Sequence, residues 1–167
     1  MSHAAVPPGF QPIRHDRLIQ EFAHDAYQTK GKLAEPTVCP LCKAVFHDGR
    51  WTWTDAPAHA HQALCPACHR ENDHFPAGYV HLAGPFFAAH REEIMNLLHH
   101  HESCERQEHP LQRIMEVEEQ EDGVMVTTTD IHLARGLGEA VHHAYQGHLE
   151  YHYNREQNLL RVHWLRQ

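Results

Sequence analysis

The apolar positions of residues 84–109 recur at the spacing expected for one face of a helix. Pro85 stands at the start of the segment, where proline suits the first helical turn, and Pro110 follows it, where proline ends a helix. The shared face would consist of Phe87, Ile94, Leu97 and Leu98. The pattern therefore predicts a long connecting helix over 84–109.

Two hairpins are predicted on either side of a second helical segment. Residues 111–129 alternate in part between apolar and polar side chains, and Asp122-Gly123 in their middle is typical of a hairpin turn. Residues 148–165 form a second such pair of runs around a turn at 155–158.

The segment between the hairpins, residues 130–147, has an apolar stripe at helical spacing. Asp130 is a good N-cap, and Gly147 is a natural C-cap. Residues 110–167 are therefore predicted to form a ββαββ module. In this antiparallel-sheet module one helix would cover one face of a four-stranded sheet.

The N-terminal half has a different character. Its first residues contain three prolines and no apolar core, so we expect a mobile arm and not a signal peptide. Leu18, Phe22 and Tyr27 fall at roughly helical spacing and predict a short amphipathic helix over 14–29. The expected organisation is an arm at 1–13, a helix plus zinc ribbon at 14–83, the connecting helix at 84–109 and the module at 110–167. The expected fold class is α+β.

Four cysteines follow the spacing C-x2-C-x22-C-x2-C. Each pair can direct two thiolates at one ion from a tight turn, and two pairs complete the tetrahedron that Zn(II) prefers. Iron bound by the same ligands and free or redox-active thiols are the alternatives. Four thiolates leave no open coordination position, so the predicted site is a structural one. The predicted ligands of one structural Zn(II) ion are Cys39, Cys42, Cys65 and Cys68.

The chain also has a fifth cysteine and 20 histidines. On a helix, Cys104 would share a face with His100 and His101, which offers a second metal site as an alternative to an exposed polar helix end. The histidines are otherwise scattered, as on a solvated surface. A histidine-rich metal-handling protein remains an alternative function.

Charge is distributed unevenly along the chain. The formal net charge is -8, yet residues 1–70 carry seven basic and six acidic side chains. The acidic excess therefore lies in the C-terminal part, which argues against a general nucleic-acid-binding surface there. The N-terminal half is the better candidate for contact with an anion.

Two tryptophans follow the first cysteine pair in the sequence. Trp51 and Trp53 alternate on a predicted strand and would face the same way. They would cover the cysteine site or, with Arg50 and Arg70, form an RNA-binding surface in which aromatic rings stack on bases.

Several classes of function are disfavoured. The chain contains no GxxxxGK[ST] phosphate loop, no G-x-S-x-G motif and no dinucleotide fingerprint, so we expect neither a nucleotide cofactor nor an enzyme. No apolar run approaches the ~20 residues that span a membrane. Paired cysteines that serve as metal ligands fit a cytoplasmic location, where thiols stay reduced.

The cysteine pairs, together with Thr128, Thr129 and Ala134 at a junction of strand and helix, resemble part of an archaeal and eukaryotic adaptor family. That family is named after nonsense-mediated decay and binds the large ribosomal subunit. Residues 14–164 resemble short uncharacterised bacterial proteins that share the phrases "CPxCxAVFHxGRW", "EHPLQRIM" and "TTDIHLARGLGEA". The resemblance implies association with a ribosome or another RNA. We therefore expect a non-enzymatic zinc-ribbon protein that binds RNA, and the alternative is a protein–protein adaptor or stress-response factor without RNA contact.

Overall fold

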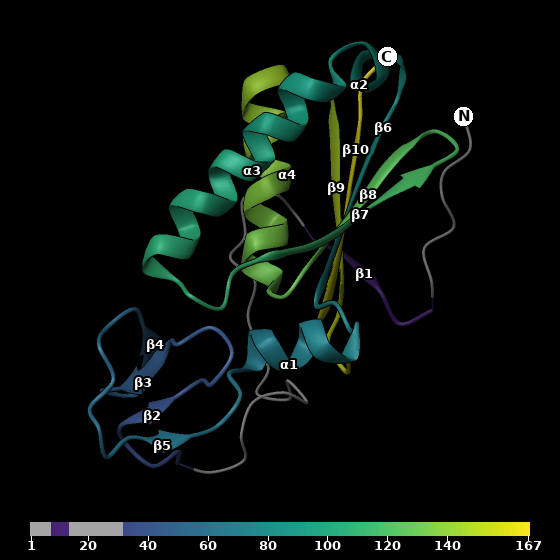
Figure 1. The fold of residues 1–167 in the computed structure, drawn as a ribbon. Helices are drawn as coiled ribbons and strands as arrows, with labels where there is room; N and C mark the ends of the chain where they lie inside the picture. Colours follow the sequence, from purple (N-terminus) through teal and green to yellow (C-terminus); the bar gives the residue numbers. More distant parts are fainter. Residues whose placement is uncertain (1–7, 14–31) are drawn as a thin grey trace.

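The computed structural model describes residues 8–13 and 32–167, and it has an α+β fold, as predicted. A large sheet carries helices on one face, and a small sheet lies beside the ends of its strands (Figure 1). The predicted helix over 14–29 lies outside the described residues. Among those that are described, no helix is long and apolar enough to cross a membrane.

The large sheet has six strands in the order β1-β9-β10-β6-β8-β7. These strands are β1 (Gln11–Ile13), β6 (Gly78–Ala83), β7 (Ile114–Gln120), β8 (Gly123–Thr128), β9 (His148–Asn154) and β10 (Leu159–Leu165). The two predicted hairpins correspond to β7–β8 and β9–β10. Residues 11–13, which were expected in a mobile arm, pair with β9.

The prediction of a four-stranded antiparallel sheet is wrong. β6 lies between the two hairpins, parallel to β10 and antiparallel to β8, so the sheet is mixed. Val80 and Leu82 of β6 are fully buried, which explains why this short strand occupies the centre. β6 precedes the connecting helix in the sequence, and the large sheet is therefore built from both halves of the chain.

Three helices lie on one side of the large sheet: α2 (Pro85–Ala89), α3 (Arg91–Glu108) and α4 (Ile131–Tyr145). α4 packs directly on the strands, and α3 packs against α4. The predicted continuous helix over 84–109 is interrupted at His90, where φ is -120°. Asp130 is the N-cap of α4, as predicted, and its carboxylate accepts hydrogen bonds from the backbone N–H groups of His132 and Leu133. The C-cap is Gln146, one residue before the expected Gly147.

The small sheet has the strand order β4-β3-β2-β5. Its strands are β2 (Thr37–Val38), β3 (Val45–His47), β4 (Arg50–Thr52) and β5 (His61–Gln62), and helix α1 (Pro66–Asp73) follows. We call residues 32–65 the ribbon. Two separate groups of buried side chains result, one between the helices and the large sheet and a smaller one around the cysteines.

Candidate metal centre

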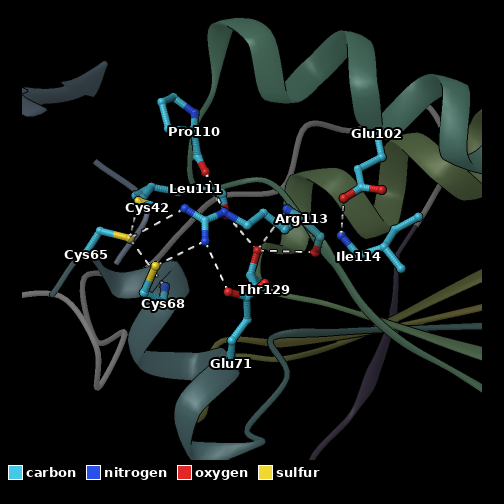
Figure 2. Close-up of polar contacts among 10 residues, drawn as sticks. All are labelled: Cys42, Cys65, Cys68, Glu71, Glu102, Pro110, Leu111, Arg113, Ile114 and Thr129. Carbon is cyan, nitrogen blue, oxygen red and sulfur yellow. Dashed lines mark hydrogen bonds and ion pairs between the residues drawn. The ribbon is translucent and has the colours of Figure 1, made fainter. Parts of the chain in front are cut away.

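The four predicted cysteines converge on one point between the ribbon and α1. Their Sγ atoms all lie within 4.8 Å of one another. Cys39, Cys65 and Cys68 are buried and Cys42 is half-buried. The Sγ atoms of Cys42 and Cys65 are 3.7 Å apart (Figure 2). This grouping fits a tetrahedral ion that is coordinated by sulfur.

Each cysteine pair is placed by a different local structure. The first pair lies in a tight turn, in which the N–H of Lys43 donates to the carbonyl of Cys39 at 2.9 Å and Lys43 adopts a φ of 70°. The second pair begins a helix, because Cys65 is the N-cap of α1 and its Sγ accepts a hydrogen bond from the N–H of Cys68 at 3.3 Å. Pro66 suits the first turn of α1.

A buried arginine contacts the thiols from the other half of the chain. The guanidinium of Arg113 donates to Cys68 Sγ at 3.2 Å and to Cys65 Sγ at 3.7 Å. It also donates to Glu71 Oε2 at 3.1 Å and to the carbonyl of Pro110 at 2.9 Å (Figure 2). Arg113 is only 2% exposed, so these partners replace the water that a buried charge loses.

The backbone around Arg113 is fixed to the large sheet. Its N–H donates to Thr129 Oγ1 at 2.9 Å, and the N–H of Thr129 donates back to the carbonyl of Arg113 at 2.9 Å. The hydroxyl of Thr129 donates to the carbonyl of Leu111 at 2.6 Å. Thr129 precedes the N-cap of α4, so the cysteine site is tied to both the sheet and the start of this helix.

Burial and hydrogen bonds have opposite effects on the thiols. Burial raises the pKa of Cys65 and of Cys68 above the usual value, and the Arg113 guanidinium offsets only part of this increase. Burial also raises the pKa of Cys39, but hydrogen bonds from the backbone of Cys42 and of neighbouring residues outweigh it and bring the pKa to about 7. Arg113 therefore favours the thiolate form, which is the form that binds a metal ion.

The tryptophans do not share one environment. Trp51 belongs to the buried group around the cysteines, is 9% exposed and contacts Phe46 with ring centroids 5.6 Å apart. Trp53 lies beyond the end of β4 and is 39% exposed. Trp51 therefore covers the cysteine site with most of its ring, and it also lines a cavity beside Arg50.

The two arginines of the predicted RNA-binding surface also differ. Arg50 is exposed on β4. Arg70 lies on α1 and is 2% exposed, although an accessible position was expected. Its guanidinium donates to the carbonyl of Phe75 at 3.1 Å and stacks over the Phe75 ring at 5.8 Å. Arg70 therefore does not belong to the same exposed surface as Arg50.

The second metal site that was considered as an alternative near the end of α3 is not assembled as three converging ligands. Cys104 Sγ lies 3.7 Å from His100 Nε2 in an exposed position. His101 points toward Gly136 of α4. Within residues 8–13 and 32–167, the only other group of three ligand atoms within 4.8 Å is the exposed set Glu35, His47 and Asp48.

Arg113 is the main residue of this site that sequence reasoning missed. It is a single basic residue between Pro110 and a strand, and no spacing rule connects it to cysteines more than forty positions away.

Comparisons with family models, with curated proteins and with solved structures find no match to this chain.

Proposed function

We propose that the four cysteines bind one structural Zn(II) ion and that the protein is a non-enzymatic binding protein organised around this ion. The observation that carries the proposal is the convergence of four Sγ atoms within 4.8 Å. A site with four thiolate ligands has no position for a substrate or an activated water, so its contribution is to folding and not to catalysis.

Arg113 supports the same proposal through its charge. Four thiolates and one Zn(II) ion carry a net charge of about −2 by simple addition of their charges, and burial of an unbalanced charge is costly. The guanidinium compensates part of this charge through its contacts with Cys65 and Cys68. A metal-bound site would thus be stabilised by the same residue that ties the ribbon to the large sheet.

Elemental analysis of the untagged, dialysed protein tests the metal site. We expect one zinc per chain and expect the Cys65→Ser variant to lose it. Cys104→Ser is the matched control, because Cys104 is exposed and lies outside the group of four. Retention of a full equivalent of zinc by Cys65→Ser would contradict the assignment, and several equivalents in the native protein would favour metal handling instead.

We infer RNA as the binding partner of the ribbon, in line with the resemblance to ribosome-associated proteins. A cavity of about 500 Å³ between the ribbon and the residues after α3 is lined by Lys32, Arg50 and Trp51. Two cations beside an aromatic ring suit a phosphate and a base. Glu35 and Asp130 also line the cavity, so the contact would be local and not a broad basic surface.

Co-sedimentation with ribosomes and separated subunits at two salt concentrations tests RNA binding. Phosphate contacts release counterions, so binding should weaken as salt increases. Arg50→Ala should weaken it further, whereas Arg91→Ala, on α3 outside this cavity, should not. Absence of binding at low salt would contradict the RNA proposal and would favour a protein partner.

A further inference from the structure

The face of the large sheet that points away from α4 carries a cluster of imidazoles and carboxylates. We call this cluster the histidine face, and it consists of His81, Asp122, His148, Glu150, His152 and His163. Side chains alternate along a strand, so the neighbours Leu149 and Val162 point into the core while the histidine face points outward. The register places Glu150 opposite His163, and His163 opposite His81, in one row across three strands.

Glu150 lies at the centre of the β9 part of this face. His148 Nε2 is 2.7 Å from Glu150 Oε1, and His152 Nε2 is 3.5 Å from Glu150 Oε2. A carboxylate with an imidazole at either side is therefore already assembled on this strand.

The imidazole of His163 is oriented by His81, which in turn contacts Asp122. His163 Nδ1 lies 2.8 Å from His81 Nδ1, and His81 Nε2 lies 2.9 Å from Asp122 Oδ1. The two imidazole rings are stacked with centroids 4.8 Å apart. Histidines that bind metals usually have their second ring nitrogen engaged in this way, which fixes the ring and leaves the other nitrogen for the ion.

We propose that the histidine face binds one divalent transition-metal ion, with His148, Glu150 and His163 as its ligands. His81 and Asp122 would be positioning residues for His163. Imidazole nitrogens with a single carboxylate suit Zn(II), Ni(II), Co(II) or Cu(II) better than Mg(II) or Ca(II). This site shares no residue with the four-cysteine site and does not depend on it.

The side chains must close on the ion. Among the described residues, two groups have ligand atoms that all lie within 4.8 Å of one another, and the histidine face is not one of them. The hydrogen bonds of Glu150 with His148 and His152 would be replaced by bonds to the metal. The His148 side chain is 61% exposed, whereas those of His152 and His81 are 16% and 11% exposed, so the ion enters from the His148 side.

Calorimetric titration of NiCl₂ into the untagged full-length protein tests the proposal. The protein is first dialysed until it holds one zinc per chain, so that the cysteines are occupied and the histidine face is free, and a chromogenic chelator reports any zinc displaced from the cysteines. We expect one Ni(II) per chain without zinc release, and affinity about tenfold or more weaker in Glu150→Gln and in His148→Ala. His81→Gln, which alters only the positioning residue, should weaken binding within the range of about 10 to 100-fold.

The control removes the competing pair on α3. His100→Ala combined with Cys104→Ser should bind Ni(II) as the native protein does. Loss of binding in this variant, unchanged binding in Glu150→Gln, or release of zinc during the titration would overturn the proposal. Thermal melts of each variant without Ni(II) establish that it is folded, and His148→Ala alters an exposed side chain that the fold tolerates.

Discussion

Trp53 caps a carbonyl that helix α3 cannot satisfy by itself. Its indole N–H donates to the backbone carbonyl of Arg106 at 2.6 Å. The residue four positions after Arg106 is Pro110, which has no N–H to offer. The ribbon thus supplies the hydrogen bond that the end of the helix lacks, and this contact joins the ribbon to the larger part of the fold.

Replacement of Trp53 by Phe should weaken this junction. An aromatic ring is kept, although it is smaller than the indole, and the N–H is lost, so we expect the free energy of unfolding to fall by about 1 kcal/mol. Chemical denaturation measures the change. Leu64→Ala is the control, since Leu64 is a similarly exposed side chain of the ribbon at 38%. An equal loss in both variants would show that the hydrogen bond contributes nothing specific.

Arg113 should be among the most sensitive positions in the chain. In Arg113→Met the acceptors Cys68, Glu71 and Pro110 lose their buried donor, and removal of one partner of a buried charged network costs about 3–5 kcal/mol. Arg113→Lys keeps the charge but cannot reach all of these acceptors from one nitrogen, so its loss should be smaller.

Thermal unfolding and a zinc competition assay with a chelator together measure the effect of the Arg113 variants. We expect both variants to lower zinc affinity, and Met more than Lys. A native-like zinc affinity in Arg113→Met would mean that the guanidinium does not stabilise the bound thiolates.

Gly123 cannot accept a side chain. A Cβ at this position would lie 1.9 Å from the carbonyl oxygen of Leu82, which belongs to the neighbouring strand β6. Gly123→Ala should therefore separate β6 from β8 and destabilise the protein by about 1–3 kcal/mol. Gly49→Ala is the control, because nothing lies within 4 Å of its added Cβ, although its φ of +75° still carries some strain. Equal melting temperatures for Gly123→Ala and the native protein would contradict the close approach.

The sequence predicted correctly those features that depend on residues close together in the chain, such as cysteine pairs and helix caps. The spacing of the cysteines identified all members of the group of four, and Asp130 was identified as an N-cap because capping involves only the next few residues. The position of β6 could not be predicted in this way, because its parallel partner β10 lies about eighty residues later in the chain. Sequence periodicity defines which face of a strand is apolar but does not determine its neighbours.

The burial of two arginine side chains is the second feature that could not be predicted from the sequence. Charged residues are mostly exposed, so Arg70 was expected at the surface and no role was predicted for Arg113. The guanidinium of Arg70 donates to the carbonyl of Phe75, five residues later, and that of Arg113 donates to the nearby carbonyl of Pro110 and to the distant Cys68 Sγ. The contact of Arg113 with the cysteines exists only in the folded chain, which is why this residue could not be assigned from its sequence neighbours.

Removal of the metal should unfold the ribbon and leave the large sheet intact. The buried group around the cysteines is small, whereas the group between the helices and the large sheet contains most of the buried apolar side chains. We therefore expect the ribbon to depend on the proposed ion for its stability, as small metal-bound modules do. Hydrogen exchange before and after chelation measures this: amides of β2, β3 and β4 should lose protection, while those of β6 and β10 should keep theirs. Loss of protection throughout the large sheet would show instead that Arg113, left without its thiolate partners, destabilises the whole molecule.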